Sequence, residues 1–323
     1  FLGKRGSGKT NAAGDLAEEL YAVGAQFVVI DPVGIWWGLR TLADGKGPGL
    51  LIHVFGGRHG DLPLLPETGR IVARVVVEKG ISAVLDLSGM RKGERKRFVF
   101  DFAEELFELK KEKRTPLHLF CEEAQNWMPQ QFPKGEPDVA RLLGTFEDII
   151  QQGRNFGLGV SLISQRPQSI NKSVLNQTEA LFCFQMNGRS DRKAIADWVE
   201  EQDINDDGGL IQRLPRLRPG EAVLWSPGWL KRLEVVQLRM KRTYHAGATP
   251  RLGERQAAPA RLAAVDVVEL QALFAETVAK AKETDPKALR QRVATLEREL
   301  AGAKRAPPAA PAAPPAPAKP DPK

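Results

Sequence analysis

Short apolar runs alternate with amphipathic stretches over the first 245 residues of this chain. The runs are rich in Val, Ile, Leu and Phe, and such runs predict β-strands. Several are apolar at every position, which is typical of strands that are covered on both faces. The predicted strands span residues 27–30, 51–55, 83–87, 117–121, 160–164, 180–184, 222–225 and 235–238.

The stretches between the runs repeat their apolar residues at helical spacing. In residues 10–23 the apolar side chains of Ala13, Leu16 and Leu20 share one face, and the pattern stops at Gly24, a residue that commonly ends helices. Residues 97–110 and 138–152 show the same spacing. Strands that alternate with helices predict an α/β fold with a mostly parallel sheet.

The composition changes after residue 245, so we expect the first domain to be 1–245. Residues 246–262 are rich in Gly, Pro and Ala and indicate a linker. Residues 263–305 are helical in pattern, and the 4–3–4 spacing of Leu289, Val293, Leu296 and Leu300 predicts a short coiled coil or, equally, a helix packed on the body. Residues 306–323 hold eight prolines and predict a disordered tail.

Overall composition narrows the class of protein. Hydrophobic residues make up 42% and charged residues 27%, which excludes a disordered or collagen-like chain. No apolar run is long enough to span a membrane, and the two cysteines lie in apolar runs, so we expect buried, reduced thiols in a cytoplasmic protein. Because the chain starts with Phe1 and its first motif begins at residue 3, we expect it to be a fragment.

The first motif is a phosphate-binding loop. Its glycines allow positive φ and let backbone N–H groups converge on phosphate oxygens, while the helix that follows adds its N-terminal dipole. The lysine can reach the β- and γ-phosphates, and the hydroxyl that follows can bind Mg²⁺. We therefore predict an ATP site with Mg²⁺ as cofactor, made by Gly3, Lys4, Arg5, Gly6, Ser7, Gly8, Lys9, Thr10 and the adjacent Asn11.

A second motif is an apolar strand that ends in two carboxylates, Glu122 and Glu123. We expect Glu122, together with Thr10, to hold Mg²⁺ directly or through water. Glu123 would orient and polarise the water that attacks the nucleotide. An acidic exit from a strand into a loop is the alternative.

Two polar residues flank the strand predicted at 160–164. Gln165 follows it directly, where open α/β sheets place their ligand sites, and its amide can sense a γ-phosphate. Arg154 precedes it in a loop, and its guanidinium offers forked donors suited to a phosphoryl group. A surface arginine or a helix cap explains Arg154 equally well.

The order of these motifs resembles that of HerA-type ATPases, which belong to the HerA/FtsK superfamily of DNA translocases. The similarity is to their DUF87-type central domain and covers about residues 1–245. It is carried by the phosphate loop and by residues 29–34, 121–125, 153–159, 164–167 and 214–222.

The resemblance implies a RecA-like core, a ring of six subunits and ATP bound between neighbours. It makes Glu123 the catalytic glutamate, Gln165 the sensor and Arg154 a finger that acts on a neighbour's ATP. One position departs from the family pattern, because Glu122 stands where Asp is usual and its extra methylene moves the carboxylate by about one bond length.

Charge and the motifs together leave three functions open. The net charge of +7 and the basic stretches 91–97 and 213–242 are compatible with sequence-independent DNA binding, although charge runs are usually solvated faces. The leading hypothesis is an ATP-driven DNA translocase or helicase that works with a nuclease or another effector. A protein-remodelling ATPase of the same fold and an ATP-gated oligomeric scaffold are the alternatives. We expect Trp36, Trp37, Trp225 and Trp229 to be packing residues.

Overall fold

The computed structural model describes residues 1–131, 137–201, 209–226, 228–247, 272 and 274–275. The chain divides into two compact units, Phe1–Val278 and Ala279–Lys323. The predicted coiled-coil segment and the tail fall almost wholly outside the described residues, as does most of the linker. The domain boundaries given above therefore stay predictions.

A five-stranded parallel sheet forms the centre of the first unit, in the order β2-β3-β1-β4-β5. Its register sets Asp31 beside Asp86 and Cys121 beside Leu162, so the carboxyl ends of the strands lie along one edge. The predicted α/β class with a mostly parallel sheet is confirmed. The strands are β1 (Gln26–Asp31), β2 (His53–Gly56), β3 (Ala83–Asp86), β4 (Leu117–Cys121) and β5 (Leu158–Leu162).

Three helices lie where their patterns predict them: α1 (Lys9–Ala22), α3 (Lys92–Glu112) and α4 (Pro137–Gln152). The sequence interpretation missed four others: α2 (Gly69–Lys79), α5 (Lys172–Asn176), α6 (Arg189–Glu201) and α7 (Leu210–Arg213). Helix α2 was missed because it is rich in valine, a β-branched residue that favours strands. The valines are Val72, Val75, Val76 and Val77. Short 3-10 helices cover Trp36–Arg40, Ala124–Asn126, Gly153–Phe156, Pro167–Ser169 and Leu214–Arg216.

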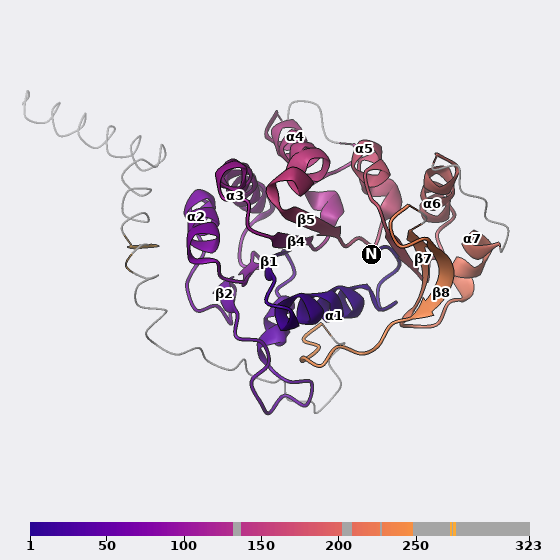
Figure 1. The fold of residues 1–323 in the computed structure, drawn as a ribbon, viewed down its shortest axis with the longest axis horizontal. Coiled ribbons are helices and arrows are strands. Elements are labelled where there is room, and N and C mark those ends of the chain that lie inside the picture. The colour runs from indigo at the N-terminus through magenta and orange to yellow at the C-terminus, as the bar shows by residue number, and fades with distance from the viewer. Residues whose placement is uncertain (132–136, 202–208, 227, 248–271, 273, 276–323) are drawn as a thin grey trace, which may run out of the picture. The chain divides into compact units, whose positions relative to one another are not determined.

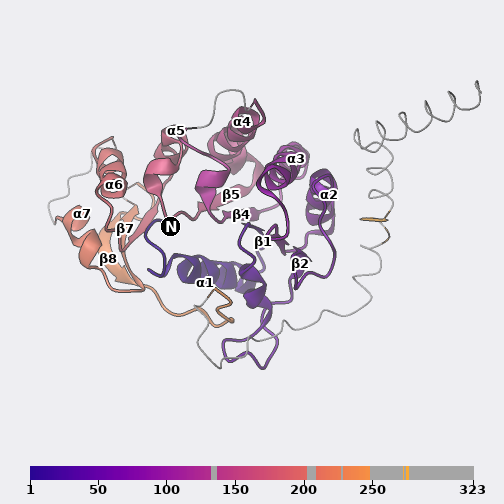
Figure 2. The same cartoon turned by 180° about the vertical axis from the view of Figure 1, so that it is seen from behind.

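The two faces of the sheet bury different side chains, because neighbouring residues of a strand point to opposite sides. In β1, Phe27 and Val29 belong to the apolar cluster that also holds Ala13 and Ala17 of α1. The alternate residues of β1 belong to the cluster that includes the inward faces of α2, α3 and α4. Figures 1 and 2 show α1 on one side of the sheet and α2, α3 and α4 in a row on the other.

The last three strands depart from the predicted parallel arrangement. The strands β6 (Leu181–Phe184), β7 (Glu221–Ser226) and β8 (Arg232–Gln237) form a separate antiparallel sheet. Leu2 joins the two sheets, because it bridges to Ser164 after β5 and to Cys183 in β6. The segment that enters the phosphate loop therefore lies between the two sheets.

Two side-chain expectations can be compared with the structure directly. Both cysteines, Cys121 and Cys183, are free and buried, as expected. Of the four tryptophans that we expected to be packing residues, three are buried, but Trp229 is 67% exposed, so its assignment as a packing residue is wrong. It lies in the turn between β7 and β8. No helix among the described residues is long and apolar enough to cross a membrane.

Candidate nucleotide and metal site

The phosphate loop is fixed at its start by both sheets. The Gly3 N–H donates to the Ser164 carbonyl at 3.2 Å, and the Lys4 N–H donates to the Gln185 carbonyl at 2.8 Å. Gly8 has φ 113°, and a Cβ there would lie 3.1 Å from the Gly220 nitrogen. Only glycine fits that position without displacing the backbone of the neighbouring loop. The motif therefore has the backbone geometry that its glycines predict.

Helix α1 begins at Lys9 without a side chain that caps its N-terminus. The first N–H groups of a helix have no partners within it and attract anions. Lys9 is buried, and its Nζ donates to the Lys4 carbonyl at 2.9 Å. Burial lowers the pKa of Lys9, while the charges of Glu122 and Glu123 raise it. A cation and free helix N–H groups thus lie together at the loop.

The two predicted metal ligands meet beside the loop. The Thr10 Oγ1 lies 3.4 Å from Glu122 Oε2, which also accepts a hydrogen bond from Trp36 Nε1 at 2.9 Å. Burial raises the pKa of Glu122 to about 8, and the negative charge of Asp31 adds to this shift. A hydroxyl and a carboxylate are oxygen ligands that suit Mg²⁺.

The described residues contain no cluster of three or more His, Cys, Asp or Glu side chains that could hold a metal ion. Mg²⁺ typically takes one or two protein carboxylates and completes its shell with phosphate and water oxygens, and Glu122 with the Thr10 hydroxyl offers such oxygens. The residues present therefore fit Mg²⁺ bound together with a nucleotide.

Asp31 organises the loop that carries Trp36. It lies fully buried at the end of β1, and its carboxylate accepts four backbone hydrogen bonds of 2.7 to 2.9 Å. Burial raises the pKa of Asp31 to about 6, although these bonds oppose the shift. The bonds fix the turn and so aim the Trp36 indole at Glu122. The four backbone N–H groups that donate to Asp31 are those of Val33, Gly34, Ile35 and Trp36. The sequence alone did not reveal this role of Trp36.

Glu123 has a left-handed backbone, with φ 51° and ψ 51°, which is uncommon for a residue with a side chain. This turn ends β4 and sends the carboxylate towards the residues that follow β5. Glu123 Oε1 accepts a hydrogen bond from the Gln165 amide, so the structure brings together the predicted catalytic glutamate and sensor. Glu123 Oε2 accepts from Gln125 Nε2 at 2.5 Å. Residues held in such conformations cluster at functional sites.

Arg154 lies away from this group. It sits in the 3-10 helix before β5, at the amino end of the strand, whereas Glu123 and Gln165 lie at the carboxyl edge of the sheet. Five residues of strand separate the two edges, which is about 16 Å. The Arg154 side chain is 87% exposed and pairs with Glu179 at 3.2 Å. A role for Arg154 in hydrolysis stays a prediction.

The side chain of Asn11 forms hydrogen bonds with the backbone of the segment that follows β8. Its amide donates to the Arg239 carbonyl at 2.8 Å and accepts from the Lys241 N–H at 3.1 Å. Glu18, about two turns further along the same face of α1, accepts from the N–H groups of Arg242 and Thr243. Together they fasten the segment after β8 to α1. A nucleotide contact by Asn11 stays a prediction.

The basic stretch 91–97 contains residues with structural contacts and residues that are exposed to solvent. Arg95 donates to the carbonyls of Met90 and Ser88, and Arg97 pairs with Glu67 at 3.1 Å. Arg91 and Lys92 are exposed at the start of α3. In the second stretch Arg213, Arg216 and Arg218 are also exposed. DNA contact by either stretch stays a prediction.

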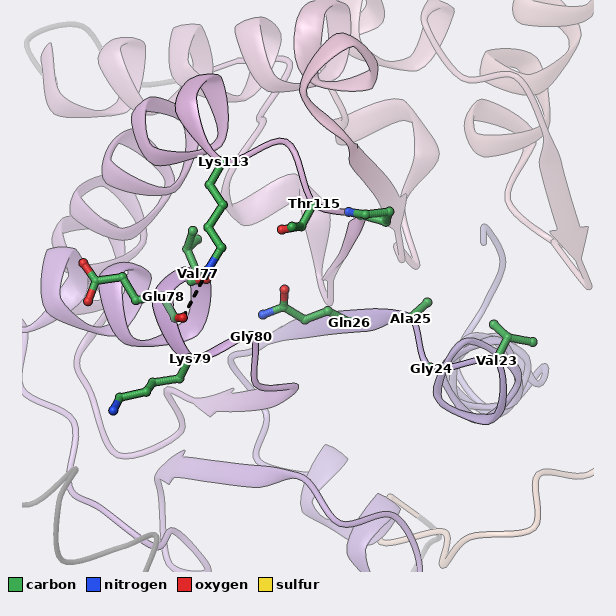
Figure 3. Close-up of a pocket in the computed structure, with 11 residues that line it drawn as sticks. Val23, Gly24, Ala25, Gln26, Val77, Glu78, Lys79, Gly80, Lys113 and Thr115 are labelled. Atoms are coloured by element: carbon green, nitrogen blue, oxygen red, sulfur yellow. Dashed lines mark hydrogen bonds between the residues drawn. The ribbon is translucent and has the colours of Figure 1, made fainter.

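A cavity of about 460 Å³ lies at the opposite edge of the sheet from the phosphate loop. It is lined by the ends of α1, α2 and α3 and by the starts of β1 and β4. Figure 3 shows Lys113 reaching to the last turn of α2, where its Nζ donates to the carbonyls of Val77 and Glu78. None of the phosphate-loop residues lines this cavity, so it is separate from the candidate nucleotide site.

Comparisons with solved structures find low similarity. The genome-packaging NTPase B204 of Sulfolobus turreted icosahedral virus 2, in complex with ATP-gammaS, is 13% identical with a TM-score of 0.49, and the match covers 74% of this chain and 96% of that one. VirB4 of Thermoanaerobacter pseudethanolicus is 14% identical with a TM-score of 0.47, over 76% of this chain and 90% of that one. At these values neither protein indicates a substrate or a partner. No family model matches the chain.

Sequence comparisons show that parts of this chain are similar to proteins named as helicases. The DNA double-strand break repair helicase HerA of Pyrococcus furiosus is 27% identical over 164 residues, 47% of this chain and 28% of the relative. The probable HerA of Methanocaldococcus jannaschii is 36% identical over 110 residues, 34% of this chain and 20% of the relative. A probable helicase of the same organism is 36% identical over 76 residues, 24% of this chain and 14% of the relative.

These alignments cover at most 28% of the relatives' own lengths. They agree with the resemblance that the motifs indicate and with the phosphate loop and parallel sheet described above. The resemblance is therefore confirmed: part of the chain is similar in sequence to HerA helicases, and the described residues combine a phosphate loop with a mostly parallel α/β sheet.

Proposed function

We propose that this chain binds ATP with Mg²⁺ at the phosphate loop and hydrolyses it. The observation that carries the proposal is the hydrogen bond between Glu123 and Gln165 at the sheet edge that also holds Lys9. A carboxylate and an amide in contact there can orient a water and sense a phosphate in one unit.

Each residue has a distinct role in the proposed reaction. Lys9 exchanges the Lys4 carbonyl for phosphate oxygens, and the helix N–H groups of α1 bind the same anion. Thr10 and Glu122 would hold Mg²⁺, which when bound would neutralise charge on the phosphates. Glu123 takes a proton from the attacking water, and Gln165 turns from Glu123 to the γ-phosphate.

We further propose that the chain is part of a ring motor, a homo-hexamer that moves DNA and works with a nuclease or another effector. The relatives named as helicases support this reading. The exposure of Arg154 supports it as well, because a solvent-exposed guanidinium that lies far from the nucleotide site of its own subunit would act only on a nucleotide held by a neighbour. Such a finger contributes roughly 10³–10⁵ in rate.

The first test compares ATP turnover with and without double-stranded DNA, in the full-length protein. Stimulation by DNA is expected; turnover that DNA leaves unchanged points to a protein-remodelling ATPase, and ATP binding without turnover points to a scaffold. Lys9→Ala should abolish hydrolysis, because the phosphates lose their fixed cation. The control is Lys46→Ala, which removes an exposed lysine from another loop.

The second test concerns the finger. Arg154→Ala should bind ATP normally and hydrolyse it poorly, whereas Arg114→Ala, a control at the same sheet edge, should remain active. Mixing Arg154→Ala with Glu123→Gln should restore part of the activity, because some interfaces then combine an intact Arg154 with an intact Glu123. No recovery in rings whose subunits exchange would refute action on the neighbour.

A further inference from the structure

Gln125 shares the Glu123 carboxylate with Gln165. Gln165 donates to Oε1, and Gln125 donates to Oε2 at 2.5 Å, so each carboxylate oxygen has its own amide. The two amides come from different elements, since Gln125 lies in the 3-10 helix Ala124–Asn126 and Gln165 follows β5. One partner can therefore leave while the other stays.

The Gln125 side chain is itself held. Its Oε1 accepts a hydrogen bond from Ser164 Oγ at 2.7 Å, so its Nε2 must face Glu123. Ser164 is 1% exposed, and its Oγ also accepts from the Arg166 N–H at 3.0 Å. The Ser164 carbonyl accepts from Gly3 at the start of the phosphate loop. The orientation of Gln125 is thus tied to the backbone that carries the loop.

We propose that Gln125 is a positioning residue that pins Oε2 of Glu123 and leaves Oε1 as the oxygen that acts as base. The inference rests on the proposed ATP hydrolysis. When Gln165 turns to the γ-phosphate, Oε1 is freed, while the bond from Gln125 keeps the carboxylate in place. The water then gives a proton to Oε1, its oxygen bonds to the γ-phosphorus, and the bond from that phosphorus to the ADP oxygen breaks, releasing ADP and phosphate.

The magnitude follows from positioning. A misplacement of about 1 Å at a reacting group can reduce the rate on the order of 10²-fold. Without Gln125, the Glu123 carboxylate loses its fixed partner at Oε2 and can rotate as soon as Gln165 leaves. We expect Gln125→Ala to lower kcat about 10- to 100-fold. The KM for ATP, the Kd of a fluorescent ATP analogue and the Tm should change little, because the Gln125 side chain bonds to Glu123 and Ser164 and reaches the loop only through Ser164.

The matched control is Gln152→Ala, which removes an exposed glutamine at the end of α4 and should leave kcat unchanged. Ser164→Ala should lower kcat less than Gln125→Ala does. In the double variant Gln125→Ala/Ser164→Ala, the kcat should equal that of Gln125→Ala alone, because Ser164 acts through Gln125. In a Glu123→Gln background Gln125→Ala should have no further effect. If Gln125→Ala lowers the Tm, the similarly sized Gln125→Met is measured in its place.

Three outcomes would overturn the inference. The first is a kcat of Gln125→Ala and Gln125→Met within about twofold of the parent. The second is a loss that appears in KM and Kd while kcat is retained. The third is full additivity with Ser164→Ala or with Glu123→Gln. In each case an inactive Glu123→Gln would show that the proposed hydrolysis stands and only the role of Gln125 fails, whereas an active Glu123→Gln would refute the proposed function itself.

Discussion

Removing one N–H from Trp36 should weaken the binding of Mg²⁺ at this site by an amount that the structure predicts. Trp36→Phe deletes the indole donor to Glu122 Oε2 and keeps an aromatic ring in the same buried position. Both side chains are 3% exposed, so water does not replace the lost bond. A hydrogen bond to a buried charged group contributes about 1.5–3 kcal/mol. That is about 10- to 150-fold in an equilibrium constant.

The direction of the effect follows from protonation. Burial is the main cause that raises the pKa of Glu122 to about 8. At pH 7 a proton therefore competes with Mg²⁺ for the carboxylate. The indole stabilises only the ionised form, and its loss raises the pKa further. The Mg²⁺ concentration for half-maximal ATP turnover should therefore rise about 10- to 150-fold at pH 7. The difference should shrink as the pH rises above the pKa.

The assay titrates Mg²⁺ at fixed ATP, at pH 7 and at pH 9, and compares Trp36→Phe with Trp37→Phe. Trp37 is also buried, but its ring packs on His59 and Tyr244. The control should keep the parental Mg²⁺ dependence. Equal Mg²⁺ dependence of parent and Trp36→Phe at pH 7, with both folded, would refute the reasoning. So would a difference that grows with pH.

Three further predictions concern stability. Burial lowers the pKa of His118 to about 4, so between pH 6.5 and 4 the unfolded chain takes up a proton that the folded chain does not. The free energy of unfolding should therefore fall by about 3 kcal/mol as the pH falls through that window. Urea titrations at several pH values should show this pH dependence in the parent protein and not in His118→Gln. Glu18→Ala should lower the free energy of unfolding by about 1–3 kcal/mol, since it leaves the N–H and the hydroxyl of the buried Thr243 without their acceptor; no measurable loss of stability would contradict this. Deleting 306–323 should leave the Tm and ATP turnover intact, and a large drop in Tm would show that the segment is docked.

Much of the fold follows from local patterns, because continuous apolar runs predict buried parallel strands. The strand of Leu117–Cys121 and its acidic end are examples, and the contact of Glu123 with Gln165 follows from two parallel strands ending at one edge. The antiparallel pairing of β6, β7 and β8 could not be predicted in this way. A strand's own pattern does not state its direction or its neighbours.

The parts of the site that sequence reasoning missed depend on tertiary geometry. Trp36 is an apolar residue in a pattern that predicts packing, and only the turn fixed by Asp31 aims its N–H at Glu122. Gln125 stands two residues from Glu123, but the left-handed backbone of Glu123 decides that their side chains meet. Neither contact leaves a periodic signal in the chain.

The bridge that Leu2 makes between the sheets has a consequence for how the protein folds. Leu2 pairs with strands that lie far along the chain, and contacts of such long sequence separation form slowly because the intervening chain must first be ordered. The phosphate loop continues directly from that bridge, so it is shaped only when β5 and β6 are already in place. In refolding, secondary structure should return before the ability to bind nucleotide. A nucleotide that binds the finished loop then draws the whole assembly towards the native state by mass action.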